Sequence, residues 1–405
     1  MKLLIIGLFT AAFLYRIFLT LLERRSFSNP IPENVKDVYD AETYEKWRGY
    51  KKEKLRTSLY AAAVGYIADM LLLIFNVYAW AASLFAGNVY NELFAVTLLS
   101  AIAGLITDIG FSWYDDMVTE QKYGFNRTDQ KTFIADQAKS FLISLGLMTG
   151  LTCALAGIHI AMGDGMLLLF TAVLFLFGLL FSFLYPVFSR IFNKFTDLED
   201  GELRGRLTSL LEKNGYKVRA IRVMDASRRS TKSNAYFTGF GKMKTIVLYD
   251  TLLDTMDADE ICAVFAHEMG HGLHKDTLKN QLLSLISMFL LAFLLWVCLR
   301  TPKIYTAFGF SGVNYGFAVI VAVSVGMGLV SPLWGLLTSW HSRRAEYRAD
   351  AQAVKEGYGP ALVSALRKLT RGNFGDLSPS PLLVKLTYSH PPLSQRIAAI
   401  EKVNQ

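Results

Sequence analysis

Residues 264–299 read VFAHEMGHGLHKDTLKNQLLSLISMFLLAFLLWVCL, and two signals of different kinds meet in this stretch. Its first part contains the pattern H-E-x-x-H, formed by His267, Glu268 and His271. Its second part, Leu282–Leu299, stays apolar over the roughly 18 residues that a membrane-spanning helix requires. The sequence predicts that the motif helix runs straight into this span. A hydrolytic motif would then lie at the end of a transmembrane helix.

The rest of the chain is apolar in a similar way. Of its 405 residues, 52% are hydrophobic, whereas soluble proteins usually contain about 45–50%. The sequence predicts a mostly α fold, a polytopic bundle of seven transmembrane helices. Very short connectors, G-N and GDG, make spans two and three and spans four and five tight antiparallel pairs. The seven predicted spans are Leu3–Leu22, Leu59–Phe85, Tyr90–Phe111, Ser140–Met162, Gly165–Arg190, Leu282–Leu299 and Tyr315–Ser339.

The orientation of the spans follows from the Lys and Arg residues near their ends. The loop 23–57 contains nine of them, whereas the connectors 86–89 and 163–164 contain none. This difference places the loop, the longer polar segments and the C-terminal tail in the cytoplasm. The first run is interpreted as a retained span, because no small-residue signal-peptide cleavage site follows it. The net charge of +8 fits loops beside an anionic membrane surface and not a nucleic-acid platform.

Two polar segments interrupt the spans and suggest a division into four parts. The first of these segments predicts a helix over 193–215, then a small β-sheet with a hairpin around Gly239 and Gly241. A second helix starts near Asp257 or Asp259, which are capping-type residues. The four parts are spans one to five (1–190), a cytoplasmic segment with the H-E-x-x-H helix (191–281), spans six and seven (282–339) and a C-terminal cytoplasmic part (340–405).

The H-E-x-x-H pattern predicts a zinc site. On a helix His267 and His271 are four residues apart, so both imidazoles project from one face toward a single ion. Glu268 points to the side of that face, where it can act on a water as general base. A catalytic zinc site needs a third protein ligand. A histidine six residues after His271 would supply it in one class of zinc protease, but Thr277 stands there.

The best candidate for the third ligand is a glutamate on a later helix. Glu346, in HSRRAEYRADAQA, follows directly after the seventh predicted span. It would therefore lie at the same membrane boundary as the histidines. Asp350 lies one turn further on the same face and could accept a hydrogen bond from a ligating imidazole.

Other polar residues have two interpretations each. Asp276 and His274 follow the motif, and either could form a hydrogen bond to a metal ligand. For His274 the interpretation as a surface residue is favoured. Asp69, Asp108 and His159 fall within or at the ends of spans, where a polar group usually faces a cavity or a partner. The cysteines form no C-x-x-C pair and are interpreted as small buried residues: Cys153, Cys262 and Cys298.

Segments along nearly the whole chain resemble one family, the type I CAAX prenyl endopeptidases, which are integral-membrane gluzincins. The resemblance includes HEMGH and the third-ligand segment SRRAEYRADAQA. It extends, in family order, to EKWRGYKKEKLRTS, TEQKYGFNRTDQKTFIADQAK, SNAYFTGFGKMKTIVLYDTLL and YSHPPLSQRI. The family likeness therefore does not depend on the metal motif alone.

The resemblance implies a fold and a set of roles. In the family seven helices enclose a water-filled chamber, and one zinc ion faces into it. His267, His271 and Glu346 match the family's zinc ligands, and Glu268 matches its general base. The family's substrate-pairing strand corresponds to Asn234, Ala235 and Tyr236. Its second catalytic block corresponds to His390 and Arg396, and in the family the histidine of this block helps to stabilise the oxyanion.

The expected partner is a membrane-tethered or lipidated peptide, and the oligomeric state is left open with a monomer as the working expectation. The segment GLHKD after HEMGH departs from eukaryotic members and favours a bacterial inner-membrane protein, with the endoplasmic reticulum as the eukaryotic counterpart. A quality-control protease of the related heat-shock type is an alternative. So is a zinc-binding seven-span transporter or receptor, although neither a fourth ligand nor an inverted repeat is evident.

Overall fold

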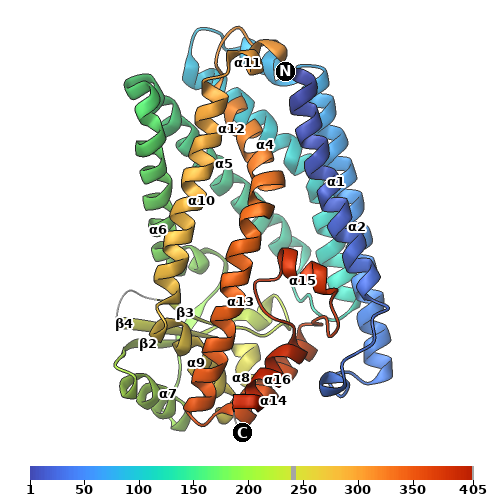
Figure 1. The fold of residues 1–405 in the computed structure, drawn as a ribbon, viewed down its shortest axis with the longest axis vertical. Helices are drawn as coiled ribbons and strands as arrows, with labels where there is room; N and C mark the ends of the chain where they lie inside the picture. The colour runs from blue at the N-terminus through green and yellow to red at the C-terminus, as the bar shows by residue number, and fades with distance from the viewer. Residues whose placement is uncertain (239–242, 404–405) are drawn as a thin grey trace.

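Long helices form an elongated bundle, and a smaller mixed part with a β-sheet lies at the end of the bundle opposite the N-terminus (Figure 1). The computed structural model describes residues 1–238 and 243–403. The long helices are α1 (Lys2–Ser26), α2 (Ala41–Ile74), α4 (Val89–Tyr114), α5 (Gln130–Met162), α6 (Met166–Phe192), α10 (Asp276–Leu299), α12 (Tyr315–Val325) and α13 (Ser331–Lys355).

Six helical stretches of the described residues are long and apolar enough to cross a membrane. One of them, Gln130–Ser182, contains two helices, because α5 and α6 are separated by a 3-10 turn at Gly163–Gly165. Another, Tyr315–Lys355, joins α12 to α13 through a π-helical turn at Gly326–Val330. Counted this way, the bundle has one membrane-length helical segment for each of the seven predicted spans.

The second predicted span is wrong at its end. Helix α2 stops at Ile74, and a separate helix, α3 (Val77–Ser83), follows. The chain turns at Asn76, which has a left-handed conformation with φ 58°. Asparagine tolerates this conformation better than most residues, and its side chain accepts a hydrogen bond from Lys2 Nζ at 2.8 Å. A run of apolar letters gave no indication of this break.

The motif helix does not run straight into the sixth span. Helix α9 (Ala258–Leu273) ends with His274 as its C-cap, and α10 starts afresh at Asp276. The residue between them, Lys275, has a left-handed φ of 55° and changes the direction of the chain. The prediction of one continuous helix is therefore wrong. The start of α9 agrees with prediction, since Asp257 caps it within a complete capping box.

The mixed part contains a four-stranded sheet in the order β1-β2-β4-β3. Strands β2 and β4 are parallel, whereas β1 and β3 pair antiparallel with their neighbours. The predicted hairpin strands are present as β3 and β4, and its turn at Gly239 and Gly241 lies outside the described residues. The predicted helix over 193–215 is shorter than expected, because its beginning forms β1. The strands are β1 (Phe195–Asp197), β2 (Lys217–Met224), β3 (Ala235–Thr238) and β4 (Met243–Tyr249).

Short helices complete the mixed part, and two of them, α7 and α14, pack against α9. Its core contains large buried side chains such as Trp47, Leu207 and Phe265, and it is separate from the apolar core of the bundle. These helices are α7 (Glu202–Lys213), α8 (Asp250–Thr255), α14 (Gly359–Gly372), α15 (Pro381–Thr387) and α16 (Leu393–Val403), while α11 (Pro302–Ala307) lies at the far end of the bundle.

The interior of the bundle is not uniformly apolar. A cavity of about 380 Å³ lies between α4, α5 and α12, and Asp108, Ser112, Ser140 and Ser144 are among its lining residues. Asp108 thus faces a cavity, as a charged residue within a span usually does. His159 instead has a partner, because its Nδ1 lies 2.9 Å from the hydroxyl of Tyr315.

Candidate metal centre

Two helices, α9 and α13, cross in close contact at the end of the bundle. The crossing depends on Gly270, where a Cβ atom would lie only 2.8 Å from the Cα of Ala349. Any larger residue would separate the two backbones. The contact therefore sets the distance between the side chains that project from α9 and those that project from α13.

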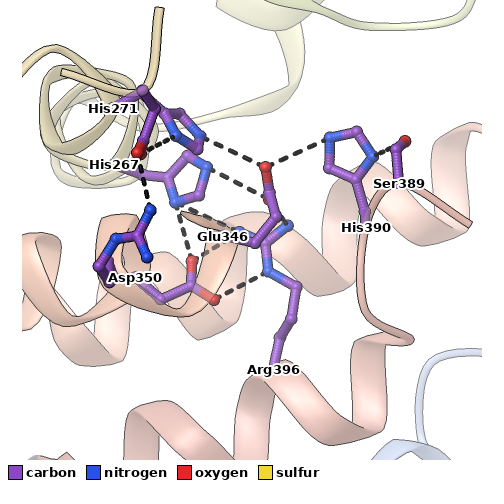
Figure 2. Close-up of polar contacts among 9 residues, drawn as sticks. His267, His271, Glu346, Asp350, Ser389, His390 and Arg396 are labelled. Carbon is purple, nitrogen blue, oxygen red and sulfur yellow. Dashed lines mark hydrogen bonds and ion pairs between the residues drawn. The ribbon is translucent and has the colours of Figure 1, made fainter. Parts of the chain in front are cut away.

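The three predicted ligands come together at this crossing (Figure 2). One ligand atom from each of His267, His271 and Glu346 lies within 4.8 Å of the others. The Nε2 atom of His267 is 3.6 Å from Glu346 Oε2, and that of His271 is 3.3 Å from Glu346 Oε1. His267 and Glu346 are only 6% and 4% exposed, so two of the three ligands are shielded from bulk water, whereas His271 is partly exposed.

The donor set fits a divalent metal ion. Although Glu346 is buried, its Oε2 accepts no hydrogen bond in the described part of the chain. Nη1 of Arg396 lies 3.4 Å from this oxygen without donating a hydrogen bond to it. A buried carboxylate oxygen that accepts no hydrogen bond is costly, and a metal ion would compensate it. Two imidazoles and one carboxylate are also the protein ligands of one kind of catalytic zinc site, which leaves a coordination position open.

A buried ion pair supports His267 from behind. Its Nδ1 lies 2.8 Å from Asp350 Oδ1. Arg396 donates two hydrogen bonds to the same carboxylate, at 2.9 and 2.6 Å. The carboxylate favours a proton on Nδ1, which leaves the lone pair of Nε2 directed toward Glu346. Burial lowers the pKa of Arg396, but the hydrogen bonds to Asp350 outweigh it and raise the pKa, so the guanidinium stays charged.

His271 has a second support, built from a different helix. Its Nδ1 lies 3.3 Å from Oδ2 of Asp276, the first residue of α10. Arg348 and Lys279 donate to the other oxygen of Asp276, at 2.7 and 3.2 Å. The turn at Lys275 creates this arrangement, because it starts α10 beside the last turn of α9. His274, the other candidate support, is the C-cap of α9.

Sequence reasoning missed Arg348. On α13 it lies two residues from Glu346, about 200° around the helix, so no helical spacing links it to the ligands. Only the packing of α10 against α13 brings it to Asp276.

The electrostatics of the crossing favour a positive charge. Burial would lower the pKa of His271, but its hydrogen bond and charge interaction with Glu346 outweigh burial and raise the pKa. Glu268 adds to the effect. Carboxylates therefore dominate the surroundings of the imidazole. A divalent cation would balance them.

Two further predicted residues flank the ligands. Glu268, next to His267 on α9, is half-buried, and in the described chain its carboxylate has no hydrogen-bond or ion-pair partner. His390 lies on the loop between α15 and α16 and is 64% exposed on its side chain. Its Nε2 is 3.5 Å from Glu346 Oε1, and its Nδ1 is 2.8 Å from the hydroxyl of Ser389 (Figure 2). Both groups are thus near the ligands, and each is at least partly exposed to solvent.

The predicted substrate-pairing residues lie on strand β3 and just before it. In the described part of the chain β3 is an edge strand, since β4 is its only neighbour in the sheet. It contacts α9, which carries the two histidines. An edge strand presents backbone N–H and C=O groups to which an extended peptide can add. The residues are Asn234, Ala235 and Tyr236.

Comparisons with known proteins agree along the whole chain. A model described as the CAAX prenyl protease N-terminal domain with five membrane helices matches residues 21–194, and the model of peptidase family M48 matches residues 197–404. CAAX prenyl protease 1 of Saccharomyces cerevisiae is 31% identical, with 100% of this chain and 96% of that protein covered. Its homolog from Arabidopsis thaliana is 32% identical, with coverages of 98% and 96%. The crystal structure of Saccharomyces mikatae Ste24p superimposes with a TM-score of 0.91 at 28% identity and covers 99% of both chains.

Proposed function

Because the chain belongs to peptidase family M48, with the membrane helices of the CAAX prenyl proteases, and is a multi-pass membrane metalloendopeptidase, we propose that it holds one zinc ion per chain on His267, His271 and Glu346. The observation that carries this proposal is the convergence of the three donors within 4.8 Å. The carboxylates behind both histidines support it, since they direct the Nε2 lone pairs of the two imidazoles to one point.

The residues around the ligands have separate roles in the proposed cleavage. Bound zinc would lower the pKa of a water toward about 7 and polarise the peptide carbonyl. Glu268 takes one proton from the attacking water and delivers it to the leaving amine nitrogen as the C–N bond breaks. His390 donates a hydrogen bond to the carbonyl oxygen as negative charge develops there. Arg396 acts through Asp350 and keeps His267 in the ligating tautomer.

The substrate is proposed to be a membrane-tethered peptide, of the prenylated CAAX type named in the relatives. It would pair as an extended strand with Asn234, Ala235 and Tyr236. The edge position of β3 and its contact with α9 support this pairing.

The proposed location is the cytoplasmic face of a membrane, with the bacterial inner membrane favoured. The nine Lys and Arg residues of loop 23–57 support this side, because that loop lies on the side of the membrane where the metal centre lies. The four-part division at 190, 281 and 339 stays a working description. The comparisons do not favour the heat-shock protease or the transporter alternative.

The test is cleavage by the purified full-length chain in detergent. A farnesylated C-terminal CAAX peptide and its unprenylated twin are incubated with the protein before chelation, after chelation and after zinc is restored, and products are identified by mass. We expect cleavage of the farnesylated peptide that disappears with the metal and returns with zinc. Cleavage that survives complete removal of the metal contradicts the zinc proposal. Equal cleavage of the twin contradicts the prenyl-substrate proposal alone.

A further inference from the structure

A groove of about 710 Å³ runs between α13, α15 and the start of α16, beside the metal centre but separate from it. Helix α15 lies between α13 and α1 (Figure 1). Trp340 lines the groove and precedes Glu346 by six residues, roughly 9 Å along the helix axis. The groove therefore lies at the same end of the transmembrane helix as the metal ligands, on another face of α13.

One wall of the groove is apolar and open to the surroundings of the bundle. Leu336 and Leu337 line it, and Leu333 continues it one turn toward the middle of the bundle with 72% of its surface exposed. Trp340 is 49% exposed at the point where the apolar part of α13 gives way to charged residues. Tryptophan is enriched at this depth, where the acyl region of a bilayer meets its headgroups.

The rim of the groove is cationic. Arg344 comes from α13 and Lys385 from α15, and both side chains are exposed. The guanidinium of Arg344 lies 4.8 Å from the centre of the Trp340 ring, which fixes its position over the apolar wall. Neither cation pairs with an acid in the described chain, and no Asp or Glu lines the groove. Within residues 1–238 and 243–403, the charge of the rim is thus uncompensated.

A third cation shapes the groove without being free to bind. Arg343 donates from Nη1 to the carbonyl oxygens of Val384 and Tyr388, at 3.0 and 2.6 Å. These bonds hold the end of α15 against α13. Arg344 and Lys385 therefore line one groove from two helices that are bonded to each other, and Arg343 adds a further positive charge to the same groove.

We propose that this groove binds an anionic phospholipid. The phosphate would lie between Arg344 and Lys385, and an acyl chain would lie along Leu333 and Leu337. Charge complementarity carries the assignment, because two unpaired cations from separate helices border an apolar wall at the membrane boundary. Basic pockets between transmembrane helices commonly bind anionic headgroups in this way. The proposal does not depend on the cleavage reaction or on the identity of the metal.

The experiment counts lipids bound to the purified full-length chain in neutral detergent by native mass spectrometry. The probes are phosphatidylglycerol and phosphatidylcholine with identical acyl chains, and inorganic phosphate is the competitor. The variants are Arg344→Gln, Lys385→Gln and the double variant. The matched control is Lys355→Gln, an exposed lysine further along α13, outside the groove and without an ion-pair partner in the described residues.

We expect phosphatidylglycerol to bind at least about tenfold more tightly than phosphatidylcholine, and to bind more weakly as salt is added. Each single variant should lose about fivefold in affinity for phosphatidylglycerol, and the double variant about 25-fold, because each basic residue near an anionic lipid surface contributes about that factor. Lys355→Gln should bind like the unsubstituted chain. Unchanged thermal midpoints would show that the variants are folded.

Three results would overturn the proposal. The first is equal affinity of the unsubstituted chain for the two lipids. The second is a folded double variant that binds phosphatidylglycerol as tightly as Lys355→Gln does. The third is full displacement of the lipid by millimolar inorganic phosphate, which would assign the two cations to a free anion. A glutamine variant with a lowered thermal midpoint is replaced by the methionine variant at the same position, which also removes the charge. Arg344→Lys, which keeps the charge, should keep the lipid.

Discussion

Two helix crossings in the described part of the chain, each with a glycine against a neighbouring backbone, have different consequences. At the α9/α13 crossing a Cβ on Gly270 would lie 2.8 Å from Ala349 Cα. At the α4/α12 crossing, within the bundle, a Cβ on Gly316 would lie 2.8 Å from the carbonyl oxygen of Leu93. The contacts are equally close. The first is surrounded by buried ionisable side chains, whereas the second packs against the apolar side chain of Val96 and borders the bundle cavity that Asp108 lines.

The difference shows what close packing contributes in each environment. Lipid chains are as apolar as the helices, so in the bundle a small residue gains stability mainly through tight contact. At the α9/α13 crossing the same contact also sets the separation of His267 and His271 from Glu346. There a shift of a few tenths of an ångström alters a binding geometry as well as a packing energy. The two crossings should therefore respond differently to the same substitution.

The largest expected effect is that of Gly270→Ala. The added methyl group pushes α9 away from the backbone of α13, so the two imidazoles and Glu346 no longer converge. We expect loss of most bound metal and at least a 100-fold loss of peptide cleavage, because ligand geometry tolerates little displacement. Elemental analysis of the purified protein measures the metal. Gly205→Ala on α7 is the control, since its Cβ would meet nothing within 4 Å. Full metal content in Gly270→Ala would contradict the claim that the α9/α13 contact sets the geometry of the ligands.

A second substitution perturbs the support of one histidine and leaves the crossing intact. Asp276→Asn keeps a hydrogen-bond acceptor for His271 but loses the charge that Arg348 and Lys279 hold in place. Metal affinity should fall about 10- to 100-fold, as is typical when such a supporting carboxylate is altered. Competition with a chromophoric chelator measures it. Asp254→Asn, on the exposed surface of α8, provides the comparison. Equal affinities for these two variants would mean that Asp276 does not orient the ligand.

The matching change in the bundle should affect stability alone. Gly316→Ala forces α12 away from α4 and should lower stability by about 1–3 kcal/mol, the usual cost of overpacking. The thermal midpoint in detergent should fall, while the metal content of the folded protein stays at that of the unsubstituted chain. Gly335→Ala on α13 is the control, because its Cβ would meet nothing within 4 Å. Metal loss in Gly316→Ala without unfolding would show that the two crossings are coupled.

The smallest expected effect concerns the start of α9. Glu260 is 3% exposed and accepts hydrogen bonds from Ser364 and Lys368, both at 2.6 Å. Burial raises its pKa, but the bonds from Lys368 and Ser364 outweigh burial and lower the pKa below its usual value. A lowered pKa stabilises the fold above the unfolded-state value of about 4.3 and loses that contribution as the pH falls through the folded-state value.

Replacing this carboxylate by an amide should therefore have an effect that depends on pH. Glu260→Gln should cost about 1–2 kcal/mol at pH 7, since a charge-assisted hydrogen bond is lost. The difference in thermal midpoint from the unsubstituted chain should shrink below about pH 4. A difference that stays constant between pH 7 and pH 4 would show that the charge of Glu260 contributes nothing.

The sequence predicted the parts of the molecule that follow from local periodicity. Each of these parts lies within one helix. Helix α9 contains His267 and His271 at their predicted spacing, and α13 contains Glu346 after an apolar run with Asp350 one turn beyond it. The resemblance to a family, and not spacing, pointed to His390 and Arg396, which the fold brings to Glu346 from a distant loop and helix.

What the sequence did not predict depends on angles between helices. The left-handed residues Asn76 and Lys275 break helices inside segments that read as continuous, because one residue of positive φ leaves no hydrophobic signature. The contact of Arg348 with Asp276 exists only because the second break turns α10 alongside α13. Such contacts follow from tertiary packing, which periodicity does not describe.

The most direct test of the central claim is one preparation of Glu268→Gln, assayed for metal content and for peptide cleavage. The claim is that the α9/α13 crossing holds one zinc ion and that the Glu268 carboxylate transfers the proton in cleavage. The account predicts metal content equal to that of the unsubstituted chain and a loss of cleavage of about 10³-fold or more. Cleavage at the unsubstituted rate by the metal-loaded variant would contradict it.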